Sequence, residues 1–126
     1  MKIYLDFEGT VVEHQYPAIG AYNEGAFEVI AALQKAGHEI ILNIYRVEFS
    51  RESLMEALAF LNNSGKIEKI KKYTPVKLEP KPWDLEQAKK DQVLFIDDIA
   101  PGIPLINALE SNTMMVDWME LAKSFS

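Results

Sequence analysis

Carboxylates stand directly after two short apolar runs that lie far apart in this chain. Asp6 follows Ile3-Tyr4-Leu5, and the pair Asp97-Asp98 follows Val93-Leu94-Phe95-Ile96. If these carboxylates meet at one site, they repel each other strongly unless a cation lies between them. Magnesium fits, because it prefers oxygen ligands and usually takes a few protein carboxylates together with substrate phosphate oxygens. The chain has no cysteine and two isolated histidines, His14 and His38, so zinc and copper fit poorly and neither histidine receives a role.

The run Asp6-Phe7-Glu8-Gly9-Thr10 adds a second carboxyl group close to the first. An aspartate such as Asp6 can act as a covalent nucleophile, while Glu8, two residues further on, can act as a general acid and then as a general base. Glycine and polar residues after an apolar run are typical of the turn that ends a strand. The run therefore predicts a reactive group at the end of the first strand.

Short apolar runs alternate with helical patterns along the whole chain. We expect strands at 2–6, 40–46, 70–73, 93–96 and 114–116. Helices are expected from an Asn23 cap to Gly37, from a Ser50 cap to Asn62, after Asp84 with Gln87, from about Pro104, and after Asp117 with Glu120. Between the third strand and third helix, Pro75, Pro80 and Pro82 predict a loop.

This alternation predicts one α/β domain over residues 1–126, Rossmann-like and three-layered, with a mostly parallel sheet and helices on both faces. In such sheets, ligands bind outside the carboxyl ends of the strands. Asp6, residues 43–46 and Asp97-Asp98 all follow strands, so we expect them at one edge of the sheet.

The composition sets limits on the partners. The 126 residues are 48% hydrophobic and 25% charged, and the net charge of −6 opposes binding to nucleic acid or to an anionic membrane. A small phosphorylated molecule remains compatible with this charge. The stretch from Met1 to Asp6 is too short and too polar for a signal peptide or a spanning helix, so we expect a cytoplasmic protein.

The motif Asp6-Phe7-Glu8-Gly9-Thr10 resembles the first motif of the haloacid dehalogenase superfamily, which reads Asp, any residue, Asp, Gly, Thr after the first strand. The resemblance implies that Asp6 attacks phosphorus to form an aspartyl-phosphate, and that Glu8 takes the acid-base role of the second Asp. Glu8 departs from the family pattern by one methylene, and a displacement of about an ångström can cost about a hundredfold in rate.

Three further motifs of the superfamily have counterparts here. The second motif, a Ser or Thr that contacts the phosphoryl group, corresponds to the run 42–46, where Asn43 and Tyr45 can donate instead. The third, a charge-neutralising Lys, is assigned to Lys81, with Lys77 as the rival, and the fourth is the pair Asp97-Asp98. The resemblance thus implies three sets of residues: catalytic Asp6, Glu8 and Lys81; substrate-binding Thr10, Asn43 and Arg46; and magnesium-binding Asp6, Glu8, Asp97 and Asp98.

The resemblance extends from the first strand to about Asp98 and leaves no segment for a large cap. It implies a magnesium-dependent phosphohydrolase acting on a small phosphorylated substrate. Its site would be open, which is compatible with a homo-oligomer in which a partner subunit covers it. A binding or regulatory module without catalysis is the alternative, since Glu8 and the second motif depart from the pattern. A phospho-receiver domain ranks below both, because receivers carry the acidic pair after the first strand and not late in the chain.

Overall fold

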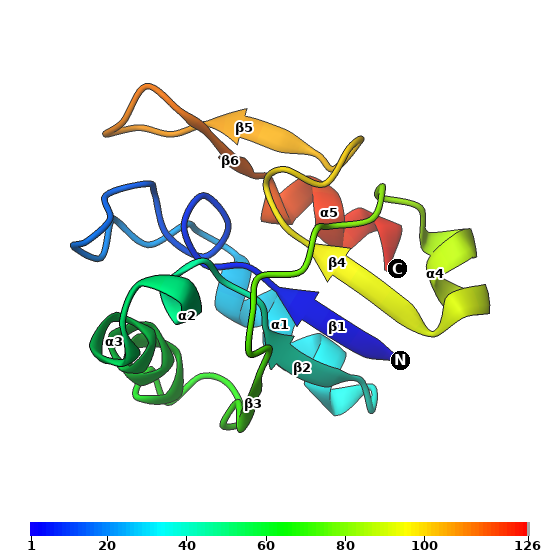
Figure 1. Cartoon of the computed structure of the whole chain (residues 1–126). Helices are drawn as coiled ribbons and strands as arrows, with labels where there is room; N and C mark the ends of the chain where they lie inside the picture. The colour runs from blue at the N-terminus through cyan, green and yellow to red at the C-terminus, as the bar shows by residue number, and fades with distance from the viewer. Residues whose placement is uncertain (126) are drawn as a thin grey trace.

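Four short strands form the central sheet of a computed structural model that describes residues 1–125 (Figure 1). The strands are β1 (Lys2–Leu5), β2 (Glu39–Leu42), β3 (Lys72–Tyr73) and β4 (Val93–Ile96), in the order β3-β2-β1-β4. All neighbouring strands are parallel, and Leu5 pairs with both Leu42 and Ile96. The residues that follow β1, β2 and β4 are therefore neighbours at one edge of the sheet.

Within residues 1–125, five helices flank this sheet: α1 (Ala26–Lys35), α2 (Arg46–Phe49), α3 (Arg51–Asn62), α4 (Leu85–Asp91) and α5 (Trp118–Ser124). The caps expected at Ser50, Asp84 and Asp117 are confirmed, since each side chain accepts a hydrogen bond from the backbone N–H three residues on. The expected cap at Asn23 is wrong. Its amide instead donates to the buried carbonyls of Thr10 and Val116, and α1 begins after Gly25.

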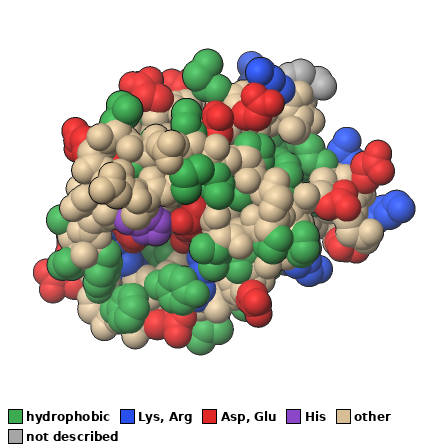
Figure 2. All heavy atoms as spheres, turned by 90° about the horizontal axis from the view of Figure 1, so that it is seen from above, with side chains coloured by type: hydrophobic (Ala, Val, Ile, Leu, Met, Phe, Trp, Pro, Cys, Tyr) green, Lys and Arg blue, Asp and Glu red, His purple; other side chains and the backbone are tan. Residues whose placement is uncertain are grey.

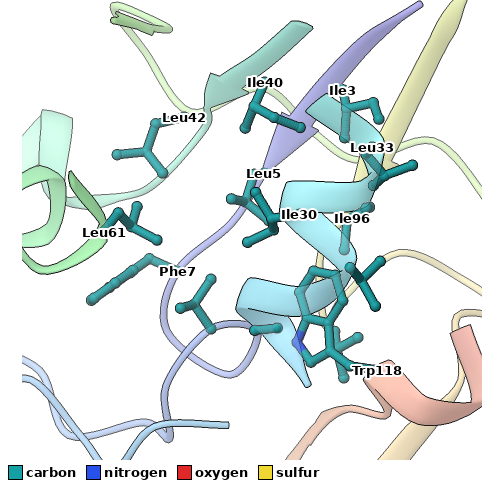
Figure 3. Close-up of a cluster of buried hydrophobic side chains, with 14 of the residues drawn as sticks. Ile3, Leu5, Phe7, Ile30, Leu33, Ile40, Leu42, Leu61, Ile96 and Trp118 are labelled. Atoms are coloured by element: carbon teal, nitrogen blue, oxygen red, sulfur yellow. The ribbon is translucent and has the colours of Figure 1, made fainter. Parts of the chain in front are cut away.

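One face of the sheet packs against helices to form the hydrophobic core. Figure 3 shows Ile3 and Leu5 of β1 pointing toward Ile30 and Leu33 of α1, with Trp118 of α5 beside them. Ile3, Leu5 and Ile30 are fully buried. Because alternate residues of a strand point to opposite faces, Tyr4 lies on the other side of β1, where its ring stacks on Phe95 with centroids 5.0 Å apart.

The other face of the sheet carries less helix than expected. In Figure 1, α1 and α5 lie behind the sheet, while the segment 74–84 passes in front of it without forming a helix. Pro75, Pro80 and Pro82 account for this, because proline removes a backbone donor and clashes in a helix interior. Pro80 is buried, so the segment packs against the sheet as a cover. The α/β architecture with a parallel sheet flanked by helices is confirmed.

Two expected elements differ in the structure. The helix expected near Pro104 is wrong: β5 (Leu105–Asn107) pairs antiparallel with β6 (Met114–Val116) in a separate two-stranded sheet. This pairing gives the backbone of each segment hydrogen-bond partners along one edge. The strand expected at 40–46 ends at Leu42, because the chain turns there and Arg46 begins α2. Among residues 1–125, no helix is both long and apolar enough to cross a membrane.

Candidate functional site

Three carboxylates meet at the carboxyl ends of β1 and β4. Asp6 follows β1 and Asp97-Asp98 follow β4, and one carboxylate oxygen from each residue lies within 4.8 Å of the others. Asp6 and Asp97 are buried, and the side chain of Asp98 is 12% exposed. Parallel pairing of β1 with β4 places these residues side by side although about ninety positions separate them in the sequence.

Lys77 is the cation of this cluster. Its Nζ lies 3.0 Å from Asp6 Oδ1 and 2.5 Å from Asp97 Oδ2, and it donates to the backbone oxygen of Asn43 at 3.0 Å. The Lys77 side chain is only 3% exposed. The structure does not bring Lys81, expected as the charge-neutralising lysine, to this cluster: that side chain is 59% exposed, and its Nζ lies 3.8 Å from Asp91 Oδ2.

Asn43 explains why Lys77 reaches the site. The Asn43 side-chain oxygen accepts hydrogen bonds from Thr74 Oγ1 at 2.9 Å and from the Leu78 N–H at 2.8 Å. Its amide donates to the Leu78 carbonyl at 3.0 Å. These bonds hold the loop after β3 so that Lys77 points toward the carboxylates. The Asn43 side chain, expected to contact substrate, has both its oxygen and its amide bonded to this loop.

The turn after β1 orients Asp6. Thr10 Oγ1 donates to Asp6 Oδ2 at 3.1 Å and accepts from the Asp98 N–H at 3.2 Å, so it links the two acidic strand ends. Thr10, expected to contact substrate, is fully buried, and its hydroxyl positions Asp6 and the end of β4. Gly9 has φ +78, and a Cβ there would collide with His14 and Asp98. Glycine is required at this point of the turn.

Glu8 lies apart from the acidic cluster and is held by Arg46. Arg46 donates to both oxygens of Glu8, from Nε at 2.7 Å and from Nη2 at 3.2 Å. Its remaining hydrogen bonds go to the backbone oxygens of Pro17, Ala18 and Ser53. Arg46 is 1% exposed, and in this structure its guanidinium and the Glu8 carboxylate, expected to bind phosphate and metal, bind each other.

His14 joins the site although nothing in its sequence surroundings indicated this. Its Nε2 lies 2.8 Å from Asp98 Oδ2, and its side chain is 40% exposed. The contact depends on the turn at Gly9, which folds the following loop back over the end of β4. The sequence signal for this contact was Gly9, which predicts a sharp turn but does not predict the path of the loop that follows.

Burial and mutual repulsion dominate the electrostatics of the cluster. Burial raises the pKa of Asp6 well above its usual value, and the charge of Asp97 adds to this. Burial also raises the pKa of Asp98, to about 6. Burial alone would lower the pKa of Lys77, but the neighbouring Asp6 and Asp97 charges outweigh it and the pKa rises. With all groups ionised, the three carboxylates exceed the one ammonium by two negative charges.

A cavity of about 420 Å³ opens over these residues. It is lined by the carboxylates, Lys77, His14 and the Glu8–Arg46 pair. Its margin contains four exposed apolar side chains: Tyr16, Tyr45, Phe49 and Ile99. Figure 2, seen from above, shows acidic and histidine side chains in a recess bordered by hydrophobic ones. The size suits a small molecule.

The fold and the site define a class: a parallel α/β protein with a lysine–carboxylate cluster at the carboxyl ends of its inner strands. No family model matches the chain, and no curated protein matches it. Among solved structures, a conserved protein coded by a locus of Bacteroides thetaiotaomicron is 30% identical with a TM-score of 0.64, and the match covers 100% of this chain and 92% of that chain. The chain belongs to the same family as that conserved protein.

Proposed function

We propose that this protein is a magnesium-dependent phosphohydrolase of the haloacid dehalogenase type, acting on a small phosphorylated substrate. The observation that carries the proposal is the buried Asp6 carboxylate beside Lys77, at the floor of an open cavity. Parallel α/β sheets bind ligands outside the carboxyl ends of their strands, so a carboxylate at the carboxyl end of an inner strand is placed to contact a ligand. An ammonium at 3.0 Å favours the arrival of an anionic phosphoryl group.

Asp6 takes the role of nucleophile. A carboxylate oxygen of Asp6 attacks phosphorus, the bond from phosphorus to the leaving oxygen breaks, and the leaving group accepts a proton. Water then attacks the aspartyl-phosphate, releasing phosphate and restoring the carboxylate. Thr10 fixes the carboxylate through Oδ2, and Lys77 lies at Oδ1, so the group is oriented before substrate binds.

The residues present fit a magnesium ion. Three carboxylates offer hard oxygen ligands within 4.8 Å of one another, and two of them, Asp6 and Asp97, already bind the ammonium cation of Lys77. Asp6, Asp97 and Asp98 would hold the ion, which would supply positive charge for the phosphoryl oxygens. Glu8 takes the acid-base role from the cavity wall, where Arg46 sets its orientation.

A binding module without turnover is the second candidate. It is favoured by one observation: both Glu8 oxygens are occupied by Arg46, so a proton donor for the leaving group is not free. The two candidates share the fold and the cluster. They differ only in whether bound phosphate esters are cleaved.

Hydrolysis of a generic aryl phosphate with magnesium tests the proposal. Turnover is expected for the wild type, and Asp6→Asn should reduce it by at least about a hundredfold, because the amide keeps the shape but lacks the nucleophile. Asp91→Asn is the matched control, since Asp91 lies outside the cavity beside Lys81. Turnover that survives in Asp6→Asn would rule out the covalent reaction, and phosphate binding without any turnover would favour the binding module.

A further inference from the structure

The margin of the cavity is unusually rich in exposed aromatic rings. Within residues 1–125, four aromatic side chains are exposed: Tyr16 at 43%, Tyr45 at 52%, Phe49 at 62% and Tyr73 at 37%. The first three line this cavity. Leaving large rings in water is unfavourable, so a cluster around one recess marks a surface that binds something apolar.

Charged residues of the site hold these rings in place. The Arg46 guanidinium lies 5.0 Å from the Tyr16 ring centroid and donates to the backbone oxygens of Pro17 and Ala18, which fixes the loop that carries the ring. Phe49 lies against Tyr16, with centroids 5.3 Å apart. On the other side, Lys77 Nζ lies 5.1 Å from the Tyr45 ring centroid. The aromatic margin is therefore built onto the residues that surround Asp6.

The polar groups that line the cavity are ionisable side chains around Asp6 and the hydroxyls of Tyr16 and Tyr45. Its lining residues include no Ser, Thr, Asn or Gln side chain among residues 1–125. The Arg46 donors already serve Glu8 and backbone oxygens. A flat apolar group can stack on the exposed rings of the margin, whereas a polyol gains no such ring contact there.

We propose that this site selects phosphate esters whose leaving group is flat and apolar, held by Tyr16, Tyr45 and Phe49 while the phosphoryl group meets Asp6 and Lys77. This inference rests on the proposed function, because it assigns a substrate class to the same cavity. The volume of about 420 Å³ accommodates a phosphoryl group with one or two rings.

Binding of two uncleavable phosphonates to the magnesium-loaded protein tests the inference without turnover. Benzylphosphonate carries a flat apolar group, and 2-hydroxyethylphosphonate carries a polar one. Calorimetry should show benzylphosphonate binding about three- to tenfold more tightly, the range expected for a ring contact. Phe49→Ala should remove most of that preference and leave 2-hydroxyethylphosphonate unchanged. Tyr45→Leu, which keeps bulk but removes the ring, should act in the same direction.

Tyr73→Ala is the matched control, because Tyr73 is the exposed ring outside this cavity, and it should change neither affinity. Equal binding of the two phosphonates, or an equal loss of both in Phe49→Ala, would overturn the aromatic selection. In that case, turnover that depends on Asp6 would still support the proposed phosphohydrolase activity. If neither phosphonate bound the wild type, the phosphoryl site itself would be refuted, and the inference with it.

Discussion

Magnesium should raise the thermal stability of this protein by a measurable and calculable amount. The ion relieves the repulsion among Asp6, Asp97 and Asp98, whose oxygens lie within 4.8 Å of one another, and it has no comparable site in the unfolded chain. At a concentration of about a hundred times Kd, binding adds about 2.7 kcal/mol to the free energy of unfolding. For a domain of this size, that corresponds to a rise in Tm of about 10 °C.

The size of this rise should depend on pH in a defined direction. Ligand carboxylates bind metal when deprotonated, and the pKa of Asp98 is raised to about 6 while that of Asp6 is also raised. The rise should be largest at about pH 7.5 and should shrink as pH falls through about 6. A raised pKa in the folded state also means that folding favours the protonated carboxyl. Without metal, these groups therefore contribute stability at low pH that is lost as pH rises through 6.

The two Tm curves, with and without magnesium, should consequently converge toward about pH 5. Differential scanning calorimetry over the range from about pH 5 to 7.5 measures both. Asp98→Asn should abolish most of the magnesium effect, whereas Asp91→Asn, a control outside the cavity, should retain it. A wild type whose Tm does not move in millimolar magnesium at the upper pH would refute the metal site, and an unchanged effect in Asp98→Asn would refute the proposed ligands.

Two further predictions concern buried cations and are measured by urea unfolding. Lys77→Met should destabilise the protein by roughly 3–5 kcal/mol, because it leaves two buried carboxylates unpaired. The control Lys81→Met, at an exposed lysine, should cost at most about 1 kcal/mol. Similar costs for both variants would contradict the placement of Lys77. Arg46→Met should also cost roughly 3–5 kcal/mol, since Glu8 loses its partner, and the surface control Arg51→Met should stay within about 0.5 kcal/mol. An Arg46→Met variant as stable as the control would show that the Arg46–Glu8 pair does not contribute to the free energy of unfolding.

Local signals in the sequence were enough to locate most elements. Ser50, Asp84 and Asp117 each bond to a backbone N–H three residues away, so the cap and the helix start are visible in one short stretch. The convergence of Asp6 with Asp97 also followed from the sequence, because parallel strands end at a common edge. These features depend on neighbouring residues or on a general rule of sheet topology.

Features that depend on the path of a loop could not be predicted from local signals in the sequence. Lys77 and Lys81 look alike in the sequence, and the choice between them depends on Asn43, which anchors the intervening loop from 35 positions away. A cue lay in chain position, because Lys77 follows β3 closely whereas Pro80 separates Lys81 from that strand end. β5 and β6 instead form a hairpin in which Leu105 pairs with Val116 and Asn107 with Met114, and the expectation of a helix from Pro104 overlooked this local pairing.

The two departures from the haloacid dehalogenase pattern are linked by one structural arrangement. The pattern has Asp where this chain has Glu8, and a hydroxyl residue near the end of the second strand, where this chain turns into the short helix that begins at Arg46. Glu8 and Arg46 meet in a bidentate pair that an aspartate, one methylene shorter, would reach less well. The same guanidinium also binds Ser53 at the start of α3 and the loop at 17–18. Glu8 therefore belongs to a largely buried connection between β1, α3 and the aromatic margin, and this connection explains the length of its side chain.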